Sequence, residues 1–96
     1  MKTIWKYKLS PDNKIVMPRD AEVLSIQLQG ASGVPYMWVL VNPDAETETR
    51  VFKIYGTGYD MPDNPGKHLG TVMTDGGAFV LHVFEDFFKI INTTKE

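Results

Sequence analysis

The residues best suited to bind a ligand gather around the tripeptide Gly56-Thr57-Gly58. It directly follows a strand-like segment, and glycines at a strand exit can expose backbone N–H groups that cradle a phosphate. Charged and aromatic partners for a nucleotide lie close by in the sequence, namely Arg50, Lys53, Tyr55 and Tyr59. The pattern predicts a compact site for a small anionic ligand. The alternative is that the two glycines serve only a sharp exit from the strand.

The side chains able to act as a base near neutral pH are His68 and His82. His68 ends a long loop-like segment and is placed to contact the same ligand, whereas His82 lies within a strand-like run and is predicted to be structural. Neither belongs to a hydrolase motif. We therefore predict no catalytic residues and no enzyme. An enzymatic alternative would pair either histidine with a carboxylate, and the candidates are Asp60, Asp63 and Glu85.

Metal and cofactor sites are not predicted. Asp44, Glu46 and Glu48 alternate and would share one face of an extended chain, but the glycine turn and distal glutamate of an EF-hand do not follow. The two histidines have no cysteine partners at zinc-binding spacing. The acidic residues are best explained as a solvated hairpin.

Tyr36 and Trp38 share one face of a regular strand. They could add an aromatic wall to the ligand site, or they could pack in the core, and the sequence leaves both interpretations open.

Length and charge set further limits. A chain of 96 residues with 10 Lys+Arg and 12 Asp+Glu forms one domain over residues 1–96, and about 65% of its surface can be buried on folding. Residues 1–19 carry five basic residues and one acidic residue, and the remainder carries five and eleven. This balance argues against binding of an extended nucleic acid.

Cellular location is inferred from three features. The chain has no cysteine, which suits a reducing compartment. The longest apolar run, residues 37–41, is too short to span a membrane, and the N-terminal residues lack the apolar core of a signal peptide. We expect a complete, unprocessed cytoplasmic protein with no membrane partner.

A period of two residues dominates the hydropathy pattern, as in strands with one buried face. Turn-forming residues separate the extended segments. We expect strands over residues 3–9, 14–17, 22–29, 35–41, 47–55, 68–74 and 78–85. Such a series predicts an all-β fold, a single compact antiparallel sandwich or barrel of about seven strands.

Local patterns predict two hairpins, one over residues 2–17 and one across Asp75-Gly76-Gly77. The alternation over residues 22–29 predicts that Leu24, Ile26 and Leu28 face the core. Residues 35–41 are apolar on both faces, which is typical of a central strand or of one whose outer face is covered.

The end of the chain is apolar and then polar. Residues 86–92 fit a short C-terminal helix or an extra strand equally well. Bulky apolar groups such as Phe87 and Phe88 are rarely left in water, so we expect the tail 86–96 to dock on the same chain or on a neighbouring subunit of a homo-oligomer.

The sequence also resembles a family of small β-rich proteins found in bacteriophage and bacterial genomes. The resemblance covers residues 2 to about 85 and rests on spaced motifs, among them Trp5-Lys6-Tyr7-Lys8-Leu9, Gly56-Thr57-Gly58 and His82-Val83-Phe84-Glu85. Family members commonly have histidine where this chain has Tyr59. The resemblance implies an association with bacteriophages and a place in the host cytoplasm.

Small phage-encoded β-rich proteins include immune-evasion sponges, which sequester the cyclic nucleotide signals of CBASS and Thoeris defence. By that analogy we expect a non-enzymatic small-ligand-binding protein, with the ligand in a pocket between subunits. The expected ligand-binding residues are Arg50, Lys53, Tyr55, Gly56, Thr57, Gly58, Tyr59 and His68. The alternative is a protein-binding inhibitor or minor virion component that uses the strand around Trp38 and the tail.

Overall fold

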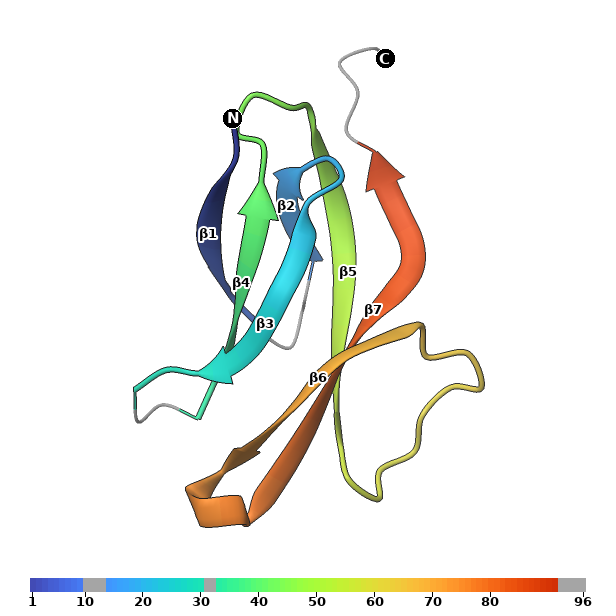
Figure 1. Cartoon of the computed structure of the whole chain (residues 1–96). Helices are drawn as coiled ribbons and strands as arrows, with labels where there is room; N and C mark the ends of the chain where they lie inside the picture. Colours follow the sequence, from blue (N-terminus) through green and yellow to red (C-terminus); the bar gives the residue numbers. More distant parts are fainter. Residues whose placement is uncertain (10–13, 31–32, 92–96) are drawn as a thin grey trace.

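The computed structural model describes residues 1–9, 14–30 and 33–91, the side chains of 75 and 87–91 excepted. Within this part the chain forms seven β-strands and one short 3-10 turn (Figure 1). The elements are β1 (Thr3–Lys8), β2 (Lys14–Pro18), β3 (Glu22–Leu28), β4 (Pro35–Val41), β5 (Thr47–Gly56), β6 (Lys67–Thr74), η1 (Asp75–Gly77) and β7 (Phe79–Ile91). None of the described residues forms a helix that could cross a lipid bilayer.

The strands form two antiparallel sheets that enclose one core. The three-stranded sheet has the order β1-β4-β3, and the four-stranded sheet has the order β2-β5-β7-β6. Strand β4 is central in its sheet, and its residues alternate between buried positions on the core face and half-buried positions on the outer face. The predicted all-β antiparallel fold of about seven strands is confirmed.

The core lies between the sheets and contains side chains from both. Met37, Val39 and Val41 of β4 face Phe52 of β5 and Val83 of β7, and all five are at most 1% exposed. Each such burial stabilises the fold by about 1.5–3 kcal/mol relative to exposure. With no disulfide available, packing of this kind holds the two sheets together.

The hairpin predicted over residues 2–17 is wrong. Strand β1 pairs with β4, and β2 pairs with β5, so the two strands belong to different sheets. The backbone N–H of Leu9 donates to the carbonyl of Pro35 across 3.0 Å and so extends the pairing of β1. Passing from one sheet to the other buries both Leu9 and Met17 in the shared core, which a local hairpin on one sheet would not achieve.

A β-bulge in β3 alters the predicted inward face. Val23 pairs with Val39 and Ser25 pairs with Trp38, so Leu24 is the extra residue. Ile26 is buried and Leu28 packs on the core as predicted, but Leu24 is 46% exposed and Val23 takes its place. A bulge adds one residue to a strand and shifts the alternation, so simple periodicity misplaces residues beside it.

Up to residue 91, the tail forms neither the predicted helix nor a separate extra strand. Residues 86–91 instead continue strand β7. A register irregularity opposite Val51 is followed by renewed pairing of Arg50 with Lys89, Thr49 with Ile90 and Glu48 with Ile91. The long, bent β7 therefore runs beside both halves of β5 (Figure 1). The side chains of Phe87 and Phe88 and all of residues 92–96 lie outside the described part.

The hairpin predicted across Asp75-Gly76-Gly77 is confirmed. Strands β6 and β7 pair from Thr74 opposite Phe79 back to Lys67 opposite Glu85. Gly76 and Gly77 have φ values of 64° and 98°, which side chains other than glycine rarely adopt. This hairpin and the long loop from β5 to β6 position the residues described next.

Candidate functional site

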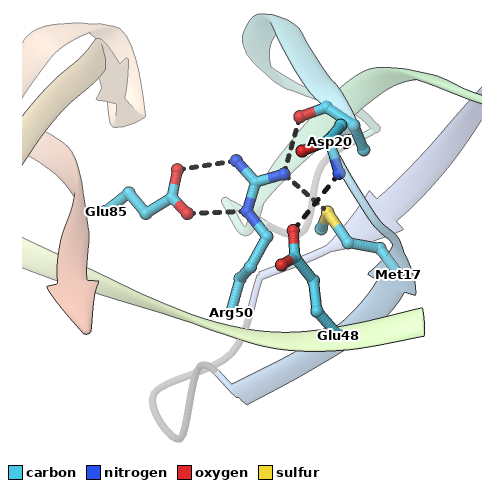
Figure 2. A network of polar contacts seen from close by, with 6 residues as sticks. Met17, Asp20, Glu48, Arg50 and Glu85 are labelled. Atoms are coloured by element: carbon cyan, nitrogen blue, oxygen red, sulfur yellow. Dashed lines mark hydrogen bonds and ion pairs between the residues drawn. The ribbon is translucent and has the colours of Figure 1, made fainter. Parts of the chain in front are cut away.

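Arg50 lies on the core-facing side of β5, where it forms a buried ion pair. Its Nε and Nη2 atoms donate to the two carboxylate oxygens of Glu85 across 2.6 and 2.8 Å (Figure 2). Its Nη1 atom donates to the carbonyl of Ala21 across 2.6 Å and lies 3.4 Å from Met17 Sδ. Arg50 is 6% exposed and Glu85 is 8% exposed. We call these four residues the Arg50 cluster.

The charge of Arg50 is fixed by its surroundings. Burial alone would lower the pKa of Arg50, but the hydrogen bonds and charge of Glu85, with smaller contributions from Glu48 and Asp20, raise the pKa above its ordinary value. Paired and buried, Arg50 joins β5 to β7 and to the segment before β3. It does not share a face with Lys53, so the structure separates it from the other residues predicted to bind the ligand.

The opposite face of the four-stranded sheet carries aromatic and imidazole rings. Register places Tyr55 opposite His82 and His68 opposite Phe84. The ring centroids of Tyr55 and Phe84 are 5.8 Å apart, and those of His68 and Phe84 are 5.2 Å apart. Lys53 is exposed on the same face, opposite Phe84. Three of the predicted residues, Lys53, Tyr55 and His68, are thus brought together here.

A line of side-chain contacts crosses this face from β5 to β6. Thr57 Oγ1 lies 2.8 Å from His82 Nε2, and Thr71 Oγ1 lies 3.0 Å from His82 Nδ1. Thr71 Oγ1 is also 3.0 Å from His68 Nε2. We call these four residues the His–Thr network. It places both nitrogen atoms of His82 within hydrogen-bond distance of threonine hydroxyl groups.

A hollow of about 380 Å³ lies where β5 ends and β7 begins. Its lining from β5 and the following loop is Ile54, Gly56, Thr57 and Tyr59, and its lining from β7 and the residue before it is Ala78, Phe79, Val80 and Leu81. Two of the aromatic walls are open to solvent, since Tyr59 is 75% exposed and Phe79 is 59% exposed. Thr57 belongs both to this hollow and to the His–Thr network.

The glycines on either side of Thr57 are required by local packing and backbone conformation. A Cβ atom on Gly56 would lie 3.2 Å from the Tyr59 ring, so the glycine lets that ring pack against the backbone. Gly58 has a φ of 87°. The N–H groups of Thr57 and Tyr59 donate to the carbonyls of Val80 and Gly56, each across 3.2 Å. These two N–H groups are therefore engaged within the protein.

The residues predicted to bind a ligand thus divide into three locations. Gly56, Thr57 and Tyr59 line the hollow, with Gly58 in the turn between them, whereas Lys53, Tyr55 and His68 lie on the outer face of the sheet. Arg50 is in the core-facing cluster. Sequence reasoning omitted His82, Thr71, Phe79 and Leu81 from the site.

The register of the β6–β7 hairpin determines that these omitted residues lie at the candidate site. It places Thr71 opposite His82 because four residues, 75–78, separate Thr74 from Phe79. The Asp-Gly pattern favours a two-residue loop, which would have given a different register. The hairpin was therefore predictable, but the contact between Thr71 and His82 was not.

No group of three or more His, Cys, Asp or Glu side chains among the described residues is arranged to hold a metal ion. The described hydrogen bonds of both histidine rings go to threonine hydroxyl groups. The arrangement is suited to hydrogen bonding and stacking with a bound molecule.

Comparison with known families gives one match. Residues 1–91 match the family described as "Domain of unknown function (DUF7352)". The chain belongs to this family. The matched range contains the hollow, the His–Thr network and the Arg50 cluster, so all three are built from the DUF7352 domain. No curated protein and no solved structure matches the chain.

Proposed function

We propose that this protein is a non-enzymatic binding protein for a small anionic ligand that contains a planar ring, and that nucleotides are the ligand class. The observation that carries the proposal is the hollow of about 380 Å³, whose lining combines Tyr59 and Phe79 with Thr57. Its volume falls within the range of roughly 300–1,000 Å³ that small-molecule sites occupy.

The aromatic walls supply the stacking surface. Tyr59 and Phe79 are largely exposed in the free protein, and a planar base between them would cover apolar surface that is now in water. Base–aromatic stacking contributes about 1–3 kcal/mol per base. This surface supports a ligand with a ring system.

The polar end of the site is formed by Thr57 and the His–Thr network behind it. The hydroxyl group of Thr57 and the imidazole of His82 are 2.8 Å apart and suit a phosphate or carboxylate. The engaged backbone N–H groups leave these side chains as the donors to an anion.

A narrower form of the proposal follows the resemblance to phage proteins. In that form the ligand is a cyclic nucleotide immune signal of CBASS or Thoeris, sequestered in the host cytoplasm without turnover. A homo-oligomer would then close the open side of the hollow with a second copy of the chain.

The test is calorimetry with a nucleotide panel, namely AMP, cyclic AMP, cyclic di-AMP and cyclic ADP-ribose. We expect at least one member to bind and to be recovered unchanged after the protein is denatured by heat. Tyr59→Ala should weaken that binding about tenfold or more, in line with the loss of one stacking contact.

Met61→Ala is the matched control, because Met61 is an exposed residue of the same loop that does not line the hollow. It should bind as the unchanged protein does. If all four nucleotides stay free in solution, the proposal fails; recovery of an altered nucleotide would instead indicate an enzyme.

A second candidate function is protein binding by the outer face of the three-stranded sheet. Ile4 is 53% exposed and lies opposite Leu40, next to the half-buried Trp38 on the same face. Ile4→Asp should abolish capture of a stoichiometric host protein if this face binds it, while Tyr59→Ala leaves the capture unchanged. Loss of capture with Tyr59→Ala alone would refute this second candidate.

A further inference from the structure

The outer face of the three-stranded sheet carries lysines beside aromatic rings. Strand register places Lys6 opposite Trp38 and Lys8 opposite Tyr36, so these side chains of β1 and β4 share the face turned away from the core. The two lysines are exposed, and the two rings are half-buried. We call these four residues the Lys–aromatic face. It is separate from the hollow, which is built from the four-stranded sheet.

The third strand of this sheet adds uncharged polar side chains. Gln27 of β3 pairs with Tyr36 and is exposed on the same face. Gln29, just after β3, accepts a hydrogen bond from Lys6 Nζ across 2.7 Å. A molecule lying across the sheet from β1 to β3 would therefore meet a cation, an aromatic ring and an amide in turn.

The rings and the Lys6 ammonium group are close enough to contact one ligand. The ring centroids of Tyr36 and Trp38 are 6.4 Å apart, and the planes are tilted by 51°. Lys6 Nζ lies over the Tyr36 ring, 5.3 Å from its centroid. Because the ammonium group already covers Tyr36, Trp38 is the ring on which we expect a second planar group to stack.

The charge beside these rings suits an anion with repeated negative groups. Lys6 and Lys8 are two positions apart on one strand, which separates them by about 6.8 Å along the strand. Glu22 is the acidic residue on this face, one pair beyond Trp38 and opposite Leu40. The net charge of −2 argues against a surface that follows a long nucleic acid, and two lysines limit the contact to about two phosphate groups.

We propose that the Lys–aromatic face binds a short segment of single-stranded nucleic acid without sequence preference. One base stacks on Trp38, and Lys6 and Lys8 contact consecutive phosphate groups. Surfaces that bind single strands combine basic groups along the backbone with aromatic rings under the bases, and this face has both. The site is independent of the proposed nucleotide site because it lies on the other sheet.

The test is fluorescence anisotropy with two labelled probes, deca-thymidylate and deca-uridylate, starting at about 20 mM NaCl. The two probes distinguish DNA from RNA as the source of the same chemistry, and binding of either one supports the proposal. We expect the logarithm of the affinity to fall by about 1.4 for each tenfold rise in salt, because each neutralised phosphate of a single strand contributes about 0.7.

Variants separate stacking from charge. Trp38→Leu should weaken binding of the probe about fivefold or more, the loss of one stacked base, and Trp38→Phe should bind more tightly than Trp38→Leu. Lys8→Gln should reduce the salt dependence by about 0.7. Lys14→Gln is the matched control, because Lys14 is an exposed lysine of β2 in the other sheet. Its affinity and salt dependence should equal those of the unchanged protein.

Three outcomes would overturn the proposal. Neither probe binds at low salt, or Lys14→Gln reduces the salt dependence as much as Lys8→Gln does, or Tyr59→Ala abolishes probe binding, which would place the oligonucleotide at the hollow. If neither probe binds and Ile4→Asp abolishes capture of a host protein, the face is a protein-binding surface instead. Failure of the nucleotide panel at the hollow leaves the Lys–aromatic face unaffected.

Discussion

The two faces of the four-stranded sheet each carry a polar cluster, and the two clusters differ in burial. The Arg50 cluster is built from β2, β5, β7 and the residue before β3, and the His–Thr network from β6, β7 and the residue after β5. The ion pair of the Arg50 cluster is buried, with Arg50 6% and Glu85 8% exposed. The His–Thr network is on the outer face, and its hydrogen bonds are exposed. Polar contacts therefore hold the fold together on one face of the sheet and are exposed to solvent on the other.

The physical reason is the cost of moving a charge out of water. Arg50 and Glu85 must each keep a partner, because an unpaired buried charge costs several kcal/mol. His82 and the two threonines can lose or exchange partners at little cost because water can replace them.

Glu85→Gln should have the largest effect on stability. It removes the carboxylate that accepts two hydrogen bonds from the buried Arg50, and we expect a loss of roughly 3 kcal/mol in the free energy of unfolding, measured in urea. Glu46→Gln is the matched control. It breaks the exposed Arg19–Glu46 pair of 3.1 Å and should cost less than about 1 kcal/mol. Equal losses in the two variants would contradict the contrast between buried and exposed pairs.

Gly66→Ala should destabilise the protein by more than about 2 kcal/mol. Gly66 has a φ of 97°, and a Cβ atom there would overlap the backbone carbonyl oxygen of Glu85. Gly58 also has a positive φ, but open space surrounds it, so Gly58→Ala should cost only about 1 kcal/mol. Thermal unfolding of both variants compares them, and a larger loss for Gly58→Ala would show that the β5 exit is the more constrained.

The double variant Arg50→Met/Glu85→Leu should be more stable than Glu85→Gln. With both charges absent, no buried charge lacks a partner. The free energy of unfolding of the double variant should therefore be only about 1 kcal/mol lower than that of the unchanged protein. A double-mutant cycle with Arg50→Met and Glu85→Leu singly measures the coupling. Additive losses would mean that the two side chains do not depend on each other.

His82→Phe should change stability by at most about 0.5 kcal/mol, because its hydrogen bonds are exposed and the ring volume is retained. Urea unfolding checks this. A loss as large as that of Glu85→Gln would make His82 a structural residue, as the sequence alone predicts, and would weaken the argument for a ligand site.

The smallest effect concerns alkaline pH. Burial raises the pKa of Tyr7 above its ordinary value of 10.0, and the charge of Arg50 opposes this rise. Because the folded protein holds the proton more strongly, this contribution to stability is present below pH 10 and is lost as pH rises through the folded pKa. Tyr7→Phe should therefore make the free energy of unfolding depend less on pH above pH 10. An unchanged pH dependence would show that other groups cause the loss of stability at alkaline pH.

Much of the fold followed from local patterns. Residues 35–41 were expected as an extended strand with two apolar faces, and β4 has these bounds and a central place. The errors arose where the hydropathy pattern does not determine which strands pair or in which register. Nothing local distinguishes a hairpin from two strands that enter opposite sheets, as β1 and β2 do, and the bulge at Leu24 is set by pairing with β4.

The candidate site was partly predictable for the same reason. Gly56, Thr57 and Tyr59 are close in sequence, so their proximity in the hollow needs only the exit from β5. Phe79 and His82 join them only through the pairing of β5 with β7. Arg50 resembled a ligand-binding cation because its partner, Glu85, is 35 positions away.

By itself, the sequence determined that this chain forms an antiparallel all-β domain, because alternation and turn residues act over a few positions and need no distant partner. Only the tertiary structure decided which face each polar residue occupies and whether its charge is paired. Those outcomes depend on strand register across the sheet, since a shift of one residue exchanges the two faces. Register therefore put Arg50 inside with Glu85 and left His82 outside beside Thr57.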